Sequence, residues 1–399
     1  MKILQVVPYF PPAYGFGGPV YGAYQISREL ARRGHEVTVY TSDARSSTER
    51  LNIESPKLDQ GVRVYYFRNI SIKLVKWSKL FIMPDMFPKS REEIKLFDII
   101  HLHEYRTFQF NPLVHYYARK YGVPYILQIH GSLPRIMGKL RLKQVYDIFF
   151  GRVLLKDASK VIALNKTEVR QLKGLGLPEE KIATMPNGID VEDYKDLPPK
   201  GSFRSRFSVD EDKKIILYIG RIHKIKGLDL LVKAYAYLLG KLKLRDTLLV
   251  IVGPDDGFLG ELSQLLHSLK MDYDRVLFTG LLDERMKLEA YVDADVFVLP
   301  SRYEAFPYVI LEAYACSKPV IASNVWSIPD IVLQGKTGLL FQKGNAKELG
   351  EAIAYILTHS DEAREMGREG RRLVEERFSL KRLVDSLETL YEEILREER

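Results

Sequence analysis

Two glutamates, Glu304 and Glu312, could bind two parts of one ligand. They follow the apolar run Val296–Leu299, and the residues around Glu312 predict a helix that begins near Pro307. Eight helical rises would separate the two glutamates by about 12 Å, more than the roughly 5–9.5 Å between the acid pairs of glycosidases. A hydrolytic pair is therefore not expected. Carboxylates at this spacing suit hydrogen bonds from the hydroxyl groups of an extended ligand.

Each glutamate also has a simpler interpretation. The Glu304 carboxylate could cap the N-terminus of the predicted helix. Glu312 lies between Leu311 and Ala313, so its side chain would be buried and would require a partner.

A second group of candidate residues is basic. Arg221 and Lys226 lie between the predicted strand Lys214–Ile219 and a predicted helix. An arginine fork and a lysine charge at a helix N-terminus suit a diphosphate. The alternative is a solvated basic turn, because Lys224 lies in the same segment.

A third candidate is the glycine-rich loop Gly15–Pro19, between the first predicted strand and the first predicted helix. At Gly17 and Gly18 the backbone can approach a ligand closely, and N–H groups near a helix N-terminus favour anions. The spacing does not match the G-x-G-x-x-G pattern of dinucleotide-binding loops, so a flexible surface loop is the alternative.

Histidines and an aspartate pair raise the question of a metal. His101 and His103 alternate along one predicted strand, and His130 ends another. The first two are expected to be structural or to contact a bound ligand rather than to bind a metal, and His130 by itself reads as a hydrogen-bonded strand-end histidine. Asp293 and Asp295 imitate an Asp-x-Asp metal motif but precede a buried strand, so we interpret them as structural. No metal is expected.

These residues need a scaffold of alternating strands and helices. Continuous apolar strands separated by helices predict an α/β protein with parallel sheets covered on both faces. Ligands of such doubly wound sheets bind outside the carboxyl ends of the strands, where the candidate residues lie. Beyond the runs already named, strands are predicted at Lys2–Val7, Glu36–Thr41, Val62–Phe67, Asp98–His103, Tyr125–His130, Lys160–Leu164, Thr247–Val252, Val276–Phe278 and Val320–Ala322.

The chain length of 399 residues exceeds that of one ordinary domain of roughly 100–200 residues, so two domains are expected. A turn-rich stretch between Met185 and Phe203 predicts the boundary. We expect a Rossmann-like domain at 1–196, a second at 197–377, and a C-terminal helix at 378–399. That helix is long enough to pack across both domains.

Composition narrows the class of protein. One cysteine, Cys316, excludes an intramolecular disulfide framework. The longest uncharged run, Ile3–Ser27, is broken by prolines and glycines, so it predicts neither a membrane span nor a secretory signal. A cytoplasmic protein is expected.

The formal charge of +8 is unevenly distributed. Residues 1–196 hold 30 Lys and Arg against 20 Asp and Glu, whereas the remainder holds 30 against 32. Two basic amphipathic stretches in the first part suit an anionic membrane surface, and the alternative is a solvated helix face. The basic residues of these stretches are Lys73, Lys76, Lys79, Arg135, Lys139, Arg141 and Lys143.

The motifs together resemble those of the retaining glycosyltransferases of family 4, also called glycosyl transferases group 1, which have the two-domain GT-B fold. The resemblance covers nearly the whole chain. The matching segments are RGHEVTVYT at Arg33–Thr41, PNGID at Pro186–Asp190, YIGRIHKIKGLDLLVKAY at Tyr218–Tyr235 and SRYEAFPYVILEAYACSKPVIAS at Ser301–Ser323.

The resemblance implies two Rossmann-like domains facing across a cleft and a set of site residues. Arg221 and Lys226 would hold the donor diphosphate, Glu304 would contact the donor sugar, and His130 would lie beside the reacting sugar. Glu312 would bind the ribose hydroxyls. The remaining donor-binding residues implied are Gly17, Gly18, Gly220, Gly253, Thr279, Phe306 and Pro307.

Three residues depart from the family pattern. Ala305 and Pro307 stand where the family often has glycine, Pro307 has no N–H to offer the donor, and Tyr308 adds bulk. The identity of the sugar therefore does not follow from the resemblance.

The implied reaction is transfer of a sugar from a UDP- or GDP-linked donor to an acceptor hydroxyl, with retained configuration and without a metal or other cofactor. The acceptor would be a glycan, a glycolipid or a lipid-linked precursor, and the enzyme could associate peripherally with the inner face of the cell membrane. An epimerase of the same fold is the alternative, although the Glu-x7-Glu spacing disfavours it. A nucleic-acid-binding protein is suggested by charge alone, and no known motif supports it.

Overall fold

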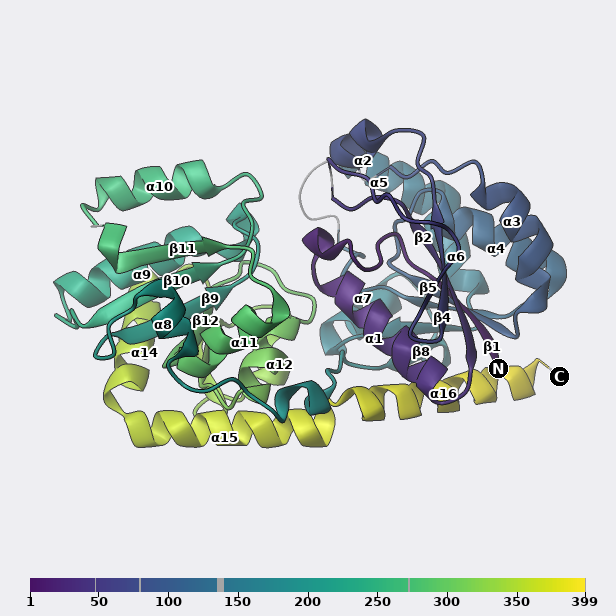
Figure 1. Cartoon of the computed structure of the whole chain (residues 1–399). Helices are drawn as coiled ribbons and strands as arrows, with labels where there is room; N and C mark the ends of the chain where they lie inside the picture. Colours follow the sequence, from purple (N-terminus) through teal and green to yellow (C-terminus); the bar gives the residue numbers. More distant parts are fainter. Residues whose placement is uncertain (47, 79, 135–139, 272, 399) are drawn as a thin grey trace. The chain divides into compact units, whose positions relative to one another are not determined.

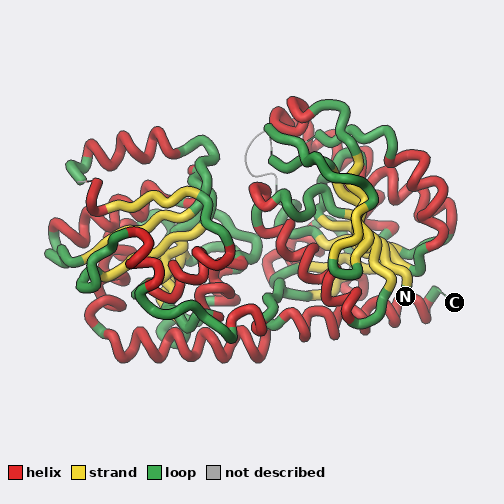
Figure 2. Tube along the Cα trace, in the orientation of Figure 1, coloured by secondary structure: helices red, strands yellow, loops and turns green. Residues whose placement is uncertain are grey.

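The computed structural model describes residues 1–46, 48–78, 80–134, 140–271 and 273–398, without the side chains of residues 15, 19, 76–78 and 273. The chain divides into two compact units (Figure 1). The N-terminal unit comprises Met1–Gly188 and Leu380–Arg399, and the C-terminal unit comprises Ile189–Ser379. In each unit, strands lie between layers of helices (Figure 2).

The N-terminal unit is built on an eight-stranded sheet in the order β3-β4-β2-β1-β5-β6-β7-β8. Only β3 runs antiparallel to its neighbour. The strands are β1 (Lys2–Val6), β2 (Glu36–Ser42), β3 (Lys57–Asp59), β4 (Val62–Phe67), β5 (Ile99–His103), β6 (Tyr125–Gln128), β7 (Lys160–Ala163) and β8 (Ile182–Thr184). The helices are α1 (Gly18–Arg32), α2 (Ile72–Ser78), α3 (Met86–Glu93), α4 (Phe110–Tyr121), α5 (Leu140–Tyr146), α6 (Arg152–Asp157), α7 (Lys166–Gly174) and α16 (Leu380–Glu397). Three short 3₁₀ helices, η1 (Tyr14–Phe16), η2 (Ile94–Leu96) and η4 (Glu179–Lys181), and the π-helical segment η3 (Asp147–Gly151) complete this unit.

Apolar residues cover both faces of this sheet, as its continuous apolar strands predict. Neighbouring residues of β1, such as Ile3 and Leu4, point into different apolar clusters. Helices α1 and α16 contribute to the cluster that contains Ile3. The C-terminal helix therefore supplies part of the core of the N-terminal unit, although it is far from that unit in the sequence.

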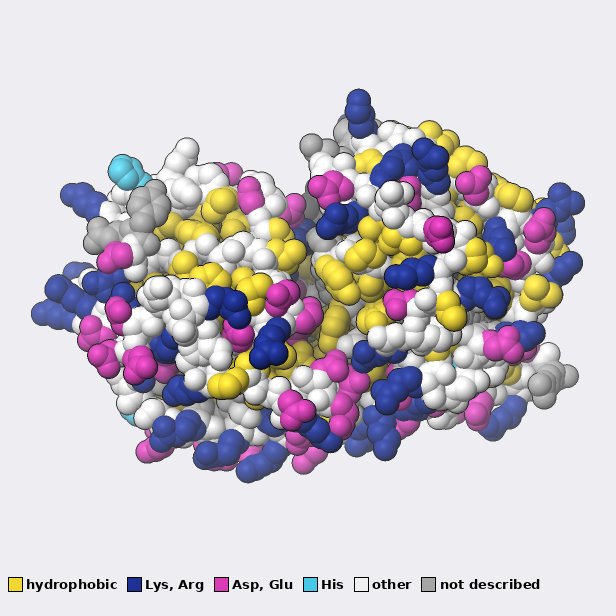
Figure 3. All heavy atoms as spheres, viewed as in Figure 1, with side chains coloured by type: hydrophobic (Ala, Val, Ile, Leu, Met, Phe, Trp, Pro, Cys, Tyr) yellow, Lys and Arg dark blue, Asp and Glu magenta, His cyan; other side chains and the backbone are white. Residues whose placement is uncertain are grey.

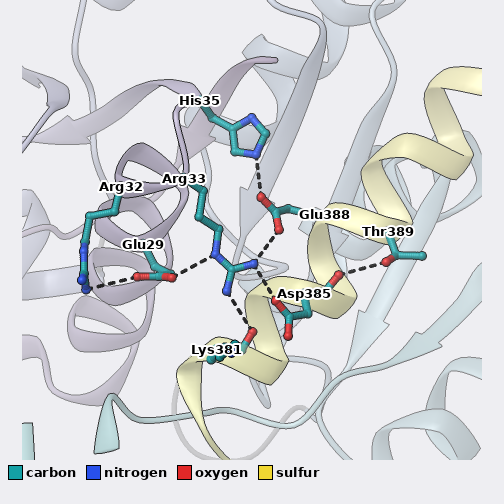
Figure 4. A network of polar contacts seen from close by, with 8 residues as sticks. All are labelled: Glu29, Arg32, Arg33, His35, Lys381, Asp385, Glu388 and Thr389. Carbon is teal, nitrogen blue, oxygen red and sulfur yellow. Dashed lines mark hydrogen bonds and ion pairs between the residues drawn. The ribbon is translucent and has the colours of Figure 1, made fainter. Parts of the chain in front are cut away.

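Arg33, at the end of α1, binds α16 through several contacts (Figure 4). Its guanidinium donates hydrogen bonds of 2.6 Å to both Asp385 and Glu388, and a 2.9 Å bond to Glu29. His35 Nε2 lies 2.7 Å from the other oxygen of Glu388. The segment that begins the first family-like motif thus holds the last helix in place.

The C-terminal unit contains a parallel six-stranded sheet in the order β11-β10-β9-β12-β13-β14. Its strands are β9 (Lys214–Ile219), β10 (Thr247–Val252), β11 (Val276–Gly280), β12 (Val296–Leu299), β13 (Val320–Ser323) and β14 (Gly338–Phe341). Its helices are α8 (Ser202–Phe207), α9 (Leu228–Gly240), α10 (Leu259–Ser268), α11 (Glu284–Asp293), α12 (Tyr308–Ala315), α13 (Ile328–Ile331), α14 (Ala346–Thr358) and α15 (Ser360–Arg377), with turns η5 (Val191–Tyr194), η6 (Lys224–Lys226) and η7 (Tyr273–Arg275).

The division between the units lies within the turn-rich stretch but before residue 196. The N–H of Ile189 donates a 3.0 Å hydrogen bond to Phe378 O, and Ile189 pairs with Ser379. The residues after Gly188 therefore belong to the C-terminal unit. After Ser379 the chain returns to the N-terminal unit as α16.

The strands that the sequence failed to predict lie at sheet edges. β3 and β8 end the first sheet, and β14 ends the second. β3 is short and largely exposed, so it lacks the apolar run that marks a buried strand. Within the described residues, no helix is both long enough and apolar enough to span a membrane.

Candidate functional site

The loops after β9 and β12 carry the main candidate residues of the C-terminal unit. The chain continues from β9 toward one edge of the sheet, and β12 begins the other half. Doubly wound sheets bind ligands outside the carboxyl ends of strands at such a reversal. Arg221 and Lys226 follow β9, and Glu304 follows β12, so the topology brings basic and acidic candidates to neighbouring loops.

Lys226 and Glu304 form an ion pair with 2.6 Å between Nζ and Oε1. The same carboxylate oxygen accepts a 2.6 Å hydrogen bond from Ser301 Oγ. The Lys226 and Glu304 side chains are only 19% and 10% exposed, so water screens the pair weakly. Glu304 uses one of the three N–H donors of the ammonium, which leaves the others for oxygens of a ligand.

Glu304 does not cap α12, because the N-cap residue of that helix is Pro307. The helix begins at Tyr308, so only the second half of the Glu304–Glu312 spacing is helical. The expectation of eight helical rises between the two carboxylates is therefore wrong. The loop conformation lets Glu304 turn toward Lys226 instead.

Arg221 has a partly exposed guanidinium that pairs with Asp256. Its carbonyl accepts a 3.0 Å hydrogen bond from the hydroxyl of Tyr218. Burial raises the pKa of Tyr218 well above its usual value, Glu304 raises it further, and Arg221 opposes the rise. The phenol of Tyr218 therefore stays protonated, and the charges of both Glu304 and Arg221 influence its pKa.

A second ion pair, Arg302 with Asp229, joins the loop after β12 to the first turn of α9, and the sequence did not predict it. Arg302 donates hydrogen bonds of 2.8 and 2.7 Å to the carboxylate and a 2.7 Å bond to Lys224 O. Burial is the largest single influence on the pKa of Asp229 and acts to raise it, but the hydrogen bond and charge of Arg302, together with a backbone N–H and Lys233, lower the pKa overall. Arg302 lies two residues before Glu304, and Asp229 lies three residues after Lys226. Two opposite charges this close to the candidate residues could have indicated the ion pair in the sequence.

Two glycines allow the strand ends to come close. Gly227 has φ +70°, and a Cβ there would lie 2.1 Å from Pro300 O. Gly253 has φ +137°, and a Cβ there would lie 2.1 Å from Gly220 O. A side chain at Gly227 would push the loop that carries Lys226 away from Pro300, and a side chain at Gly253 would push the end of β10 away from Gly220, which precedes Arg221.

Glu312 is buried on α12 and has the partners that its burial requires. Its Oε1 lies 3.0 Å from Lys287 Nζ, and its Oε2 accepts a 2.9 Å hydrogen bond from Tyr291. Burial raises the pKa of Tyr291 well above its usual value, and the Glu312 charge adds to this effect. Each carboxylate oxygen of Glu312 thus has a partner of its own within the C-terminal unit.

The other predicted donor-binding residues lie around the same strand ends. Phe306 is buried, and its ring packs at 67° to that of Phe378, with 5.6 Å between centroids. Pro307 is extended, with φ −79°. Thr279 lies near the end of β11, and its hydroxyl bonds to Gly280 O at 3.0 Å.

The Asp-x-Asp segment has a structural role, as expected. Asp293 accepts hydrogen bonds from two backbone N–H groups at the start of α8, those of Gly201 at 2.5 Å and Arg204 at 3.0 Å. Asp295 accepts a 2.8 Å bond from the N–H of Ile215. Among the described residues, no three His, Cys, Asp or Glu side chains converge so as to hold a metal ion.

In the N-terminal unit, the predicted glycine loop lies between β1 and α1. Gly17 is the N-cap residue of α1 and has φ +88°. Its N–H donates a 3.0 Å hydrogen bond to Tyr14 O, and Gly18 begins the helix. The first N–H groups of α1 therefore follow a backbone turn that favours glycine.

His130 lies beyond the end of its strand, because β6 ends at Gln128. The prediction of a strand reaching His130 is wrong, since His130 has φ +46° and begins a turn. The N–H of the next residue, Gly131, donates a 2.6 Å hydrogen bond to Glu168. Burial raises the pKa of Glu168 to about 7, although hydrogen bonds from the backbone oppose the rise. His130 Nε2 lies 3.0 Å from His103 Nδ1.

Two family models match the chain, Glycosyltransferase Family 4 over residues 16–193 and Glycosyl transferases group 1 over residues 200–373. N-acetyl-alpha-D-glucosaminyl L-malate synthase of Bacillus anthracis is 27% identical, and the alignment covers 100% of this chain and 99% of that protein. D-inositol 3-phosphate glycosyltransferase of Frankia alni is 30% identical, with 84% of each chain covered. Anabaena HepE, solved in complex with UDP and glucose, has a TM-score of 0.79 at 20% identity, over 98% of this chain and 99% of that one.

These similarities extend over both units. The expected fold class is confirmed, since two α/β units with largely parallel sheets match GT-B structures. The family models and named relatives give no support to the epimerase alternative. The chain belongs to glycosyltransferase family 4 and is a glycosyltransferase.

Proposed function

We propose that this glycosyltransferase moves a sugar from a nucleoside-diphosphate donor to an acceptor hydroxyl with retention of configuration. The observation that carries the proposal is the placement of Arg221 and Lys226 beside buried Glu304 at the strand ends. The two cations would neutralise the diphosphate, and the carboxylate would accept hydrogen bonds from the sugar. The complex of HepE with UDP and glucose supports a donor of this kind.

The mechanism that we propose is a front-face displacement. The bond from the anomeric carbon to the diphosphate breaks as the acceptor oxygen bonds to that carbon from the same face. The departing phosphate oxygen takes the proton of the acceptor hydroxyl. Positive charge fixed by Arg221 and Lys226 stabilises the negative charge that develops on the diphosphate, so this step needs no metal or other cofactor.

The remaining residues complete the proposed donor site. Glu312, oriented by Lys287 and Tyr291, would accept hydrogen bonds from the ribose hydroxyls through its remaining lone pairs. The nucleotide base, of UDP or GDP, would lie by the backbone near Gly253 and Thr279. On the N-terminal unit, Gly17, Gly18 and His130 would contact the donor phosphates, the reacting sugar or the acceptor.

A donor panel tests this function. UDP- and GDP-linked sugars are added to the protein, and thermal unfolding is followed. The matched donor at 100 times its Kd should stabilise the protein by about 2.7 kcal/mol. With that donor, an acceptor should trigger nucleotide release in the presence of EDTA, and NMR of the product should show the donor's anomeric configuration. An inverted product, or release that requires a divalent cation, would contradict the mechanism.

We further propose that the N-terminal unit binds an anionic membrane surface that carries a lipid-linked acceptor. On the segment α5–η3–α6, Val145, Ile148, Phe149 and Val153 recur at helical spacing and are 40–67% exposed. Three basic residues of the segment are also exposed, Arg141, Arg152 and Lys156. On the face in view in Figure 3, the unit that carries the N-terminus has hydrophobic and basic side chains next to one another, with acidic side chains among them.

The basic residues named from the sequence are only partly covered by the structure. Lys73 and Arg141 are exposed, and Lys143 is half-buried. Lys79, Arg135 and Lys139 lie outside the described residues, as does the side chain of Lys76. The proposal therefore rests on α5–η3–α6, where the acidic Asp147 and Asp157 are both engaged in ion pairs.

Co-sedimentation with liposomes tests the membrane proposal. Vesicles with anionic lipid should bind the protein in a salt-sensitive way, and Phe149→Ser should weaken binding several-fold. Leu58→Ser, at an exposed apolar position on β3, is the control. Equal binding to neutral and anionic vesicles, or equal binding by the wild type and Phe149→Ser, would contradict the proposal that this surface binds membranes.

A further inference from the structure

A chain of hydrogen bonds crosses the N-terminal unit from α16 to His130. Gln5 on β1 and His103 on β5 are completely buried, with 2.6 Å between Gln5 Oε1 and His103 Nε2. His103 Nδ1 lies 3.0 Å from His130 Nε2. At the other end, Gln5 Nε2 donates to the hydroxyl of Tyr391 at 3.4 Å, and that hydroxyl lies 2.9 Å from His101 Nδ1.

The direction of the hydrogen bonds in this chain follows from the orientation of the Gln5 amide. Its Nε2 donates to the Tyr391 hydroxyl oxygen, and its Oε1 faces His103 Nε2. Because the Tyr391 oxygen already accepts from Gln5, the hydroxyl hydrogen is directed to His101 Nδ1. The neutral ring of His101 then carries its proton on Nε2.

The bonds on the other side of Gln5 are determined by the same amide. The Gln5 oxygen accepts from His103 Nε2–H, so His103 Nδ1 is an acceptor. His130 must consequently donate from Nε2, which leaves its Nδ1 unprotonated.

Burial keeps the three rings neutral, so each retains one donor and one acceptor nitrogen. It lowers the pKa of His130 to about 4 and that of His101 to about 3. The pKa of His103 lies well below its usual value, again mainly because of burial. His130 itself is only partly buried, and no hydrogen bond to its Nδ1 is found within the described residues.

We propose that Tyr391, Gln5 and His103 are positioning residues that hold His130 in the tautomer with its proton on Nε2. Its Nδ1 then accepts a hydrogen bond from a hydroxyl group of the sugar substrate, a ligand that rests on the function proposed above. An acceptor nitrogen selects a neutral sugar with a hydroxyl at that point and disfavours one with a carboxylate there. The network also accounts for a buried glutamine and two buried histidines on otherwise apolar strands.

The C-terminal helix is essential to this arrangement. Tyr391 is completely buried among apolar residues of α1, α16 and the sheet. The contacts of Arg33 with Asp385 and Glu388 hold the same helix one to two turns before Tyr391 (Figure 4). The last helix of the chain thereby determines which nitrogen of His130 is free.

The direct test reads the tautomer by NMR in protein labelled with ¹⁵N in its histidine rings. The His130 signals are assigned from a His130→Asn spectrum. Wild-type His130 should show a protonated Nε2 and an unprotonated Nδ1. In Tyr391→Phe the Gln5 amide loses its acceptor, so the His130 signals should move toward a mixture of tautomers. A wild-type His130 protonated on Nδ1 would overturn the proposal.

Kinetics with the matched donor provide the second readout. Tyr391→Phe should lower kcat by about tenfold, the effect of one lost hydrogen bond, and leave the Kd of the free nucleotide unchanged. Tyr125→Phe is the matched control, because its buried hydroxyl bonds to Leu154 O at 2.7 Å outside the network. It should leave both the His130 signals and kcat unchanged. A Tyr391→Phe protein with wild-type signals and wild-type kcat would contradict the positioning role.

The two proposals can fail separately, because the tautomer is read without substrate. A protein that transfers no sugar, yet has His130 protonated on Nε2, would refute the proposed function and support the network. A protein that transfers sugar with His130 protonated on Nδ1 would support the proposed function and refute the network.

Discussion

Six strands of the N-terminal sheet, β4-β2-β1-β5-β6-β7, have the same order as the six strands of the C-terminal sheet, but the two units carry different chemistry at the point where that order reverses. In the N-terminal sheet the reversal lies between β1 and β5, and in the C-terminal sheet between β9 and β12. The C-terminal unit has ion pairs there, Lys226 with Glu304 and Arg302 with Asp229. The N-terminal unit has neutral amide, imidazole and phenol groups joined by hydrogen bonds.

This difference separates two ways of recognising a ligand. Charge acts over several ångströms and without strict direction, so it suits the diphosphate group that all nucleoside-diphosphate sugars share. A neutral network in a buried setting is directional, since each donor must meet an acceptor. We infer that the C-terminal unit binds the common part of the donor, whereas the N-terminal unit can distinguish individual hydroxyl groups.

Loss of a charge from the C-terminal site should have the largest effect. Lys226→Met or Glu304→Gln should lower kcat by about 10²–10³-fold with little change in melting temperature, because each removes a group aimed at the transition state. Steady-state kinetics and circular dichroism measure the two quantities. Lys224→Met is the control, since Lys224 is an exposed lysine two residues earlier. Near-wild-type turnover in Lys226→Met or Glu304→Gln would contradict the role of charge that distinguishes the C-terminal unit from the N-terminal unit.

Weakening the contact between Arg302 and Asp229 should have an intermediate effect on activity. Arg302→Lys removes the bidentate bond to Asp229 and should lower kcat/KM by about tenfold, because the loops of Lys226 and Glu304 lose their fixed spacing. Arg206→Lys removes a similar bidentate pair with Glu289 and should leave kcat/KM unchanged. Equal losses in both variants would mean that the effect is one of stability alone.

Glu312→Gln should affect nucleotide binding rather than chemistry. An amide accepts fewer hydrogen bonds than a carboxylate, so the Kd of free UDP or GDP should rise about fivefold by calorimetry. Glu284→Gln is the control, because Glu284 pairs with the same Lys287 but is exposed. Unchanged nucleotide affinity in Glu312→Gln would count against the ribose contact.

The neutral network should reveal itself in the dependence of stability on pH. The pKa values of His130 and His101 are lowered to about 4 and about 3, so the unfolded chain binds protons more readily than the folded one below pH 6.5. Their contribution is therefore present above pH 6.5 and is lost as the pH falls, by up to about 1.4 kcal/mol per pH unit for each ring. Glu168, with its pKa raised to about 7, opposes this trend between pH 7 and 4.5.

Thermal unfolding between pH 7 and 4.5 measures that slope. His101→Asn should flatten it, and His267→Asn, which replaces an exposed histidine, should not. If stability depends on pH in the same way in the wild type and in His101→Asn, burial in the network does not disfavour the charged form of His101.

Much of the scaffold could be predicted because strands buried on both faces are continuous apolar runs. Four predicted strands match the structure at both ends, Val62–Phe67, Lys214–Ile219, Thr247–Val252 and Val296–Leu299. The edge strands β3, β8 and β14 were missed, since an edge needs no such run. The strand before His130 was predicted two residues too long, because a left-handed turn leaves no trace in hydropathy.

The candidate site was predictable to the extent that its residues lie in local motifs. The positions of Lys226 and Glu304 after their strands follow from the sequence, but their direct contact does not. The pair of Arg302 and Asp229 was not predicted, because a bidentate contact between a loop and the first turn of α9 depends on the strand order. Glu312 was expected to need a partner, yet only the packing of α11 against α12 shows Lys287 and Tyr291 in that role.

By itself, the sequence determined the α/β class, the two-unit organisation and the residues able to meet a diphosphate, because these depend on local patterns. Only the tertiary structure decided which groups touch. The five residues of the network come from four distant parts of the chain, and the direction of each hydrogen bond depends on the groups at both of its ends. These parts are Gln5, the pair His101 and His103, His130, and Tyr391. The free nitrogen of His130 is therefore a property of the folded unit.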